Sequence, residues 1–184
     1  MDLRAKSSND YRWDDLRIAM SSVKVAGVHD PNFAKLTGSG ATDGVYTYFF
    51  DPATEEEVYF ETQMPHDWYQ GSSIYPHIHW CPTSTGSGNV VWGLEYTLAS
   101  VSGTFGQTVL MSASFAATGT INYHQMAILP SMSMSGKTIS CIIFGRLYRA
   151  AADGGDTYAE DAAAISFDFH YQKDDRGSYN QYTK

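Results

Sequence analysis

Apolar and polar side chains alternate most clearly over Asn89–Val101. Val90 and Trp92 fall on one side of an extended chain, and Asn89 and Glu95 fall on the other. A period of two residues is typical of a β-strand with one face in a core. The segment therefore predicts a strand with its tryptophan side buried.

The segment Tyr75–Pro82, which reads Y-P-H-I-H-W-C-P, shows the same alternation with different chemistry. Ile78 and Trp80 share one face, whereas His77 and His79 share the other. Because alternate side chains of a strand point the same way, the two imidazoles lie side by side. We expect the Ile78 face to pair across a G-S-G turn with the Trp92 face of the next strand, as a hairpin at the centre of the core.

Six further segments are predicted as strands from alternation or continuous apolar character: 45–50, 57–64, 107–116, 121–129, 138–148 and 162–172. The first two are expected to form a hairpin, and 138–148, apolar on both faces, to be a central strand. About eight antiparallel strands without a long amphipathic helix predict an all-β fold, a jelly-roll-like β-sandwich.

The ends of the chain have a different character from its middle. Residues 1–44 contain several turn formers and no clean period, and the segment 13–25 is compatible with a short strand or an arm. We therefore expect an extended N-terminal arm and loop over 1–44, a β-sandwich domain over 45–172, and a polar C-terminal tail over 173–184. Such an arm is expected to become ordered by contact with a partner surface.

Composition narrows the classes of function. The formal net charge of -8, without a cluster of lysine or arginine, disfavours nucleic-acid binding. No apolar stretch approaches the length of a membrane helix, and the first residues lack a secretory pattern, so we expect no membrane partner and synthesis in a cytoplasm. Cys81 and Cys141, each in an apolar strand pattern, predict two buried free thiols.

Histidines provide the strongest candidate for chemistry. His77 and His79 form an H-x-H pair, and Asp168 and His170 form a second polar pair on the last strand. If these strands are neighbours, His77, His79 and His170 could bind a divalent metal together with a carboxylate from Asp168 or Glu95. The spacing does not match a cupin, in which a glutamate follows the H-x-H pair within a few residues.

Two other interpretations of the histidines remain open. Three copies of an H-x-H strand can meet on a trimer axis and surround one ion with six imidazoles, as in phage tail tips. Alternatively, the histidines lie on a half-buried face and hydrogen-bond to neighbouring groups. The chain has no nucleophile elbow, zinc-protease helix motif or phosphate-binding loop. We expect no catalytic activity and no cofactor.

Aromatic residues suggest a third possibility, since tryptophan and tyrosine rings can stack on the apolar faces of sugars. Trp80 and Trp92 alternate with apolar residues and are expected in the core. Trp68 and Tyr69, in a loop, are the better surface candidates for a carbohydrate-binding module. A pair of acids for glycoside hydrolysis, such as Glu61 with Glu95, requires a geometry that the sequence does not give.

Several motifs together resemble a family of small proteins encoded by tailed bacteriophages and prophages. They are W-D-D-L-R (13–17), P-H-x-W and G-S-x-I-Y-P-H-I-H-W-x-P (65–82), G-N-V-V-W-G-L-E-Y (88–96), D-G-G-D-T-Y (153–158), F-D-F-H-Y (167–171) and the terminal Y-T-K. The resemblance implies a virion-associated structural protein and brings no catalytic residues. It places the protein in the virion, after synthesis in the host cytoplasm.

The leading prediction is therefore a bacteriophage structural protein, a homotrimer that decorates the capsid or belongs to the neck or tail. Its expected partners are further copies of itself and phage capsid or tail proteins. The alternatives are a cupin-like metal-binding protein or enzyme that uses His77, His79 and His170, and a carbohydrate-binding module.

Overall fold

The computed structural model describes residues 11–36, 44–174, 177–181 and 183–184. These residues form ten strands and no helix. The strands are β1 (Arg12–Ala19), β2 (Asn32–Lys35), β3 (Tyr46–Phe50), β4 (Glu56–Gln63), β5 (Tyr75–Pro82), β6 (Asn89–Ala99), β7 (Val109–Ala116), β8 (Gln125–Ile128), β9 (Ile142–Arg149) and β10 (Ala162–Lys173). In this part of the chain, no helix of membrane-spanning length and apolarity occurs.

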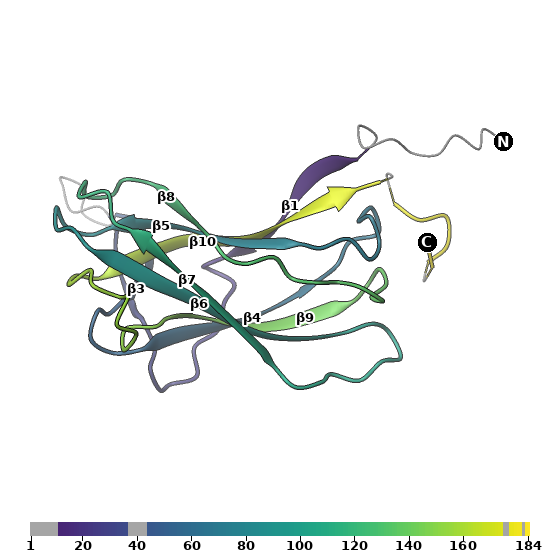
Figure 1. Ribbon diagram of the computed structural model, residues 1–184, viewed down its shortest axis with the longest axis horizontal. Helices are drawn as coiled ribbons and strands as arrows, with labels where there is room; N and C mark the ends of the chain where they lie inside the picture. The colour runs from purple at the N-terminus through teal and green to yellow at the C-terminus, as the bar shows by residue number, and fades with distance from the viewer. Residues whose placement is uncertain (1–10, 37–43, 175–176, 182) are drawn as a thin grey trace.

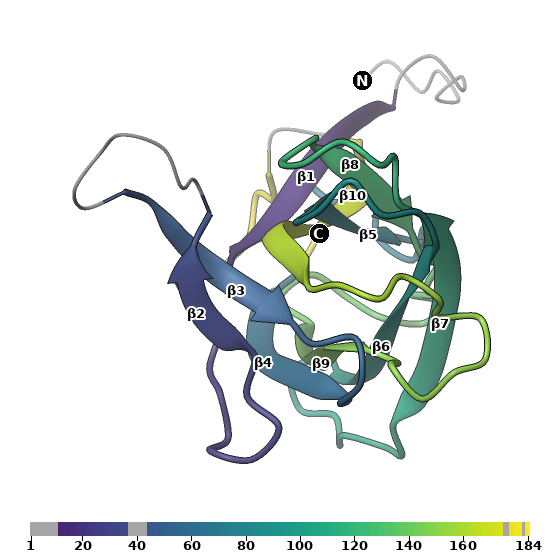
Figure 2. The same ribbon diagram turned by 90° about the vertical axis from the view of Figure 1, so that its left-hand side faces the viewer.

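The strands form two antiparallel sheets that pack face to face. Sheet A has the order β2-β3-β10-β5-β8, with β1 paired to β10, and sheet B has the order β4-β9-β6-β7. Figure 1 shows β5 and β10 in one layer and β4 and β9 in the other, and Figure 2 gives the view turned by 90°. The predicted all-β, jelly-roll-like sandwich is therefore confirmed, with ten strands where about eight were expected.

Two predicted hairpins are wrong. The strands β3 and β4 lie in different sheets, and so do β5 and β6. The turns after Phe50 and after Pro82 therefore carry the chain across the core from sheet A to sheet B. Trp80 and Trp92, expected to be neighbours within one sheet, instead face each other from opposite sheets, with ring centroids 6.2 Å apart.

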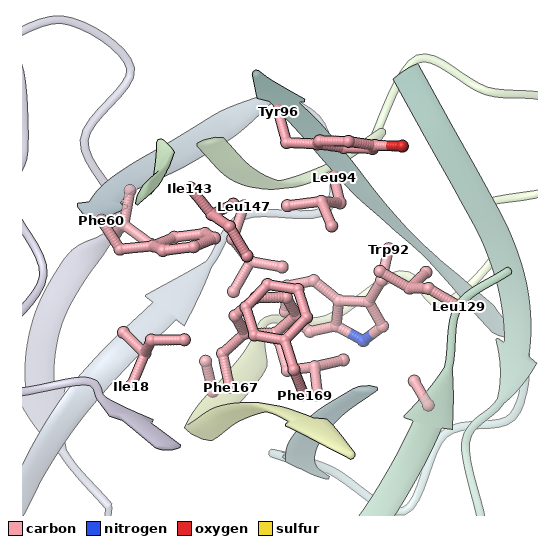
Figure 3. Close-up of a cluster of buried hydrophobic side chains, with 14 of the residues drawn as sticks. Ile18, Phe60, Trp92, Leu94, Tyr96, Leu129, Ile143, Leu147, Phe167 and Phe169 are labelled. Carbon is pink, nitrogen blue, oxygen red and sulfur yellow. The ribbon is translucent and has the colours of Figure 1, made fainter. Parts of the chain in front are cut away.

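One core fills the space between the sheets (Figure 3). Sheet A contributes Ile78, Phe167 and Phe169, and sheet B contributes Trp92 and Leu147, all fully buried. Burying large apolar side chains on both inner faces is the main favourable term for such a sandwich. The predicted central strand, β9, indeed lies between β4 and β6.

The last strand, β10, connects most of sheet A. Its start, at Ala162–Ala164, pairs with β3 on one side, and its remainder pairs with β1 on that same side. Its other side pairs with β5, with a register shift between Ala164 and Ser166. The strands β1 and β2 come from the 1–44 range, of which residues 1–10 and 37–43 lie outside the described residues.

Candidate functional site

The histidines of β5 and β10 meet on the outer face of sheet A, away from the core. His77 lies opposite Asp168 in the register of β5 and β10, and His170 lies opposite Tyr75. The ring centroids of His77 and His79 are 5.1 Å apart, and those of His77 and His170 are 4.0 Å apart. All three predicted metal-site residues are therefore neighbours, because β5 and β10 are adjacent strands.

Asp168 is the carboxylate closest to both β5 histidines. Its Oδ2 atom lies 3.1 Å from Nε2 of His79 and 3.6 Å from Nε2 of His77. The side chains of His77 and Asp168 are only 2% and 5% exposed, whereas that of His79 is 23% exposed. We call His77, His79 and Asp168 the histidine–aspartate cluster.

Glu95, the other carboxylate considered for a metal site, lies on β6 in the opposite sheet. Its Oε2 atom accepts a hydrogen bond of 3.1 Å from Nε of Arg146. It therefore takes no part in the histidine–aspartate cluster. The chain itself covers His77, so an arrangement of six imidazoles on a trimer axis would require this face of sheet A to open.

Two further residues join the histidines, and sequence patterns did not single them out. Asp15 on β1 accepts from His170, with 3.0 Å between Oδ1 and Nε2. His124, just before β8, places Nε2 2.7 Å from Nδ1 of His79. The inward positions of Leu16 and Ile18 would have placed Asp15 on the outer face, but no pattern marks His124.

Burial lowers the pKa of His77 and of His79, since removing an imidazolium from water disfavours its charged form. The nearby carboxylate of Asp168 acts in the opposite direction on both residues without reversing the shift. The neutral imidazole, the form that binds metals, is thus the favoured form of both side chains.

A second polar site lies on the outer face of sheet B. It is a groove of about 400 Å³, and we call it the Arg146 groove. Its lining includes Glu57, Tyr59, Glu95, Thr97, Phe144 and Arg146. These residues lie on β4, β6 and β9, and Thr108, just before β7, also lines the groove. A hollow of about 400 Å³ adjoins it and shares Tyr59, Phe60 and Phe144.

Arg146 organises this groove. Its guanidinium binds the carboxylates of Glu55, Glu57 and Glu95 and stacks on the ring of Tyr148, 4.2 Å from the ring centroid. Tyr148 is buried because Gly93, opposite it on β6, leaves room for its ring. Three carboxylates around one guanidinium give the groove a net negative charge.

The carboxyl group of Glu57 is held in its ionised form. Burial alone would raise its pKa, but hydrogen bonds from Tyr59 and Arg146 outweigh burial and lower it. In turn, the carboxylates of Glu57 and Glu55 raise the pKa of Arg146 despite its partial burial. The groove therefore presents fixed charges, and charged hydrogen-bonding groups of this kind are strong donors and acceptors.

The aromatic residues divide differently from the prediction. Trp80 and Trp92 are in the core, as expected. The prediction that Trp68 lies on the surface is wrong. Its side chain is fully buried, and its Nε1 donates to Ser72 Oγ at 3.0 Å. The loop folds back over its own ring, which local sequence does not reveal.

Exposed rings line two hollows instead. Phe144, in edge contact with Phe105 at 5.3 Å, lines the Arg146 groove. Trp13 and Tyr75, in edge contact at 5.4 Å, line a hollow on sheet A beside His170.

Comparisons with known proteins identify no family for this chain. No family model matches it. No curated protein matches it either.

Several solved structures have similar folds. A family 35 carbohydrate-binding module from Clostridium thermocellum is 11% identical, with 85% of this chain and 97% of that chain covered and a TM-score of 0.48. The CBM22-1 and GH10 modules of xylanase 10B from Clostridium thermocellum, complexed with xylohexaose, are 10% identical, with coverages of 91% and 27% and a TM-score of 0.40.

A third structure, TmCBM61 in complex with β-1,4-galactotriose, is 12% identical, with coverages of 87% and 86% and a TM-score of 0.31. Identities this far below 25%, at TM-scores below 0.5, assign neither a family nor a ligand to this chain.

Proposed function

We propose that this chain is a non-catalytic carbohydrate-binding β-sandwich that holds an oligosaccharide in the Arg146 groove. The observation that carries the proposal is the pairing, in one open groove, of an exposed aromatic ring with a fixed set of charged hydrogen-bonding groups. Phe144 provides the ring, and Arg146 with Glu57 and Glu95 provides the charged groups.

Sugar chemistry fits both halves of this groove. A pyranose ring has an apolar face of C–H groups, and the ring of Phe144, 48% exposed, offers a surface on which such a face can stack. Its hydroxyl groups both donate and accept, so carboxylates and a guanidinium can bind them in pairs. Because Arg146 and Glu57 already hold each other in place, binding costs little side-chain entropy.

The charge state of the groove supports binding without hydrolysis. Glycosidases need one carboxylic acid with a raised pKa to protonate the leaving oxygen. Glu57 is the opposite case, since hydrogen bonds from Tyr59 and Arg146 lower its pKa and keep it ionised. Glu61 and Glu95, considered as a catalytic pair, lie on β4 and β6 with β9 between them.

Affinity electrophoresis in gels that contain xylan, galactan or bacterial lipopolysaccharide tests the proposal, with calorimetry on the oligosaccharides of any retarding polymer. We expect retardation by at least one of them and a loss of 10-fold or more in affinity for Phe144→Ala and for Arg146→Met. Phe33→Ala removes an equally prominent exposed ring from β2 in sheet A and serves as the matched control. The proposal would be overturned if no polymer retarded the wild-type protein, or if Phe33→Ala lost as much affinity as the groove variants.

A virion structural role, implied by the sequence resemblance, is the second candidate function. The observation that favours it is apolar exposure on two edge strands, β7 of sheet B and β8 of sheet A, which contact each other along one side of the sandwich. Val109 and Leu110 on β7, and Met126 and Ile128 on β8, are exposed. Edge strands with such side chains can pair with another chain.

Under this second proposal, the β7–β8 side is the contact between copies in a homotrimer on a capsid or tail. Light scattering should give three chains per particle for the wild type, and Leu110→Lys should give a monomer, with Thr104→Lys on the neighbouring exposed loop as control. A monomeric wild-type protein at high concentration argues against it. Mass spectrometry of purified phage particles tests the location in the virion directly.

A further inference from the structure

The histidine–aspartate cluster has the spacing of a metal site. Two ligand atoms that each lie about 2.1 Å from a tetrahedral zinc ion are about 3.4 Å apart. The distances from Oδ2 of Asp168 to the Nε2 atoms of His79 and His77 are 3.1 and 3.6 Å and bracket that value. One ligand atom from each of the three residues lies within 4.8 Å of the others.

The hydrogen bonds around His77 orient its free nitrogen toward the cluster. Its Nδ1 lies 3.3 Å from the carbonyl oxygen of Tyr75. A carbonyl can only accept, so Nδ1 carries the hydrogen, and Nε2 of the neutral ring has a lone pair. That lone pair faces the carboxylate oxygen of Asp168 without a hydrogen between them. A cation placed between the two atoms would turn this repulsion into attraction.

The other two ligands are also held from behind. Ser166 Oγ donates to Oδ1 of Asp168 at 2.8 Å, which leaves Oδ2 for the cluster. Nδ1 of His79 lies against Nε2 of His124, so an Nδ1–H tautomer of His79 can donate to His124 and free its own Nε2. Supporting bonds of this kind orient metal ligands and fix their tautomers.

We propose that His77 Nε2, His79 Nε2 and Asp168 Oδ2 bind one divalent transition-metal ion on the outer face of sheet A. Two imidazoles and one carboxylate suit Zn²⁺, Co²⁺, Ni²⁺, Mn²⁺ or Fe²⁺. The partial exposure of His79 gives the ion a route from solvent. The remaining coordination positions would be taken by water or by a ligand from outside.

Asp15 and His170 lie next to this site and form a second group with His77. We assign the ion to Asp168 because Asp15 already binds His170 at 3.0 Å and Arg17 at 3.6 Å. Arg17 is also opposite Asp168 in the register of β1 and β10, but its side chain is 75% exposed. Its charge there is largely screened by water.

Titration of the full chain without a histidine tag tests the site, with Co²⁺ followed by visible absorption and Zn²⁺ followed by calorimetry. We expect one equivalent of Co²⁺ with the absorption bands of nitrogen and oxygen ligands, displaced by Zn²⁺. His79→Ala and Asp168→Asn should each weaken binding 10-fold or more, in line with the loss of a ligand. Asp168→Asn keeps the size of the side chain, so it separates loss of metal from loss of fold.

His29→Asn is the matched control, since His29 is exposed, lies far from the cluster in the chain and has a φ of 59° that asparagine tolerates well. It should bind Co²⁺ and Zn²⁺ as the wild type does. A wild-type protein that binds no Co²⁺ and no Zn²⁺, or a double variant His79→Ala, Asp168→Asn that keeps wild-type affinity, would overturn the proposal. The sugar-binding variants lie on the other sheet and leave this result unaffected.

Discussion

Arg149 and Asp156 form a fully buried, two-point ion pair at the end of sheet B. Nε and Nη2 of Arg149 donate to the two carboxylate oxygens of Asp156 at 3.0 and 2.7 Å. The three remaining N–H groups of the guanidinium donate to the carbonyl oxygens of Phe50, Tyr158 and Glu160. One side chain thus satisfies all five donors and ties the loop after β9 to the end of β3.

Replacing Arg149 by methionine should be strongly destabilising. The change leaves the charge of Asp156 buried without its partner, and removing one member of a buried pair typically costs about 3–5 kcal/mol. Urea unfolding followed by tryptophan fluorescence measures the loss. The double variant Arg149→Met, Asp156→Leu should recover part of it, whereas a loss below about 1 kcal/mol in the single variant would contradict the role given to the pair.

Gly93→Ala should disturb both stability and the Arg146 groove. A Cβ atom at Gly93 would lie 2.1 Å from the end of the Tyr148 ring, so the ring on which Arg146 stacks has to move. We expect a loss of about 1–3 kcal/mol, the usual cost of overpacking. Gly106→Ala, where a Cβ atom meets nothing within 4 Å, is the matched control and should stay within about 0.5 kcal/mol. Equal effects at both glycines would contradict this explanation.

Neither cysteine should react in the native state. Cys81 and Cys141 are free and buried, as the sequence predicted, and burial raises the pKa of Cys81 to about 11 and that of Cys141 above its usual value. Since the thiolate is the reactive form, a thiol reagent at pH 8 should label neither residue in the folded protein and both in denaturant. Rapid labelling of the native protein would contradict this and show that the segments around the two cysteines open.

Glu57 should contribute to unfolding in acid. Its pKa is lowered in the folded state, so the unfolded chain takes up a proton first as the pH falls. The stabilisation is therefore complete above the unfolded pKa of about 4.5 and is lost as the pH decreases through the lower folded value. Urea midpoints between pH 7 and pH 3 should fall less steeply for Glu57→Gln than for the wild type. Glu61→Gln, an exposed change on the same strand, should follow the wild type.

Alternation along the chain predicted the strands well because it is a local property. The bounds of β5 were predicted as Tyr75–Pro82, and the common face of His77 and His79 followed from them. The choice of sheet for each strand was predicted badly, because the turns after Phe50 and Pro82 are compatible with either a hairpin or a crossing between sheets. The strand partners distinguish the two arrangements, since β5 pairs with β10 and β8, whereas β6 pairs with β7 and β9.

The candidate sites show the same difference between features that local sequence predicts and features that depend on the complete fold. The meeting of His77 with Asp168 and His170 was conditional on the adjacency of β5 and β10, which the structure establishes. The Arg146 groove was not predicted, because its residues come from β4, β6 and β9, and no sequence pattern relates Glu57 to Arg146 across 89 positions. Long-range pairing of this kind depends on the complete fold.

The placement of β10 has a consequence for how the protein is made. This strand, the last of the ten to be synthesised among the described residues, pairs with β1, β3 and β5. At about 5–20 residues per second, the ribosome completes it seconds after β1 has emerged. Until then β1 has no partner strand and β5 can pair only with β8, so sheet A closes only after the C-terminal strand has left the ribosome.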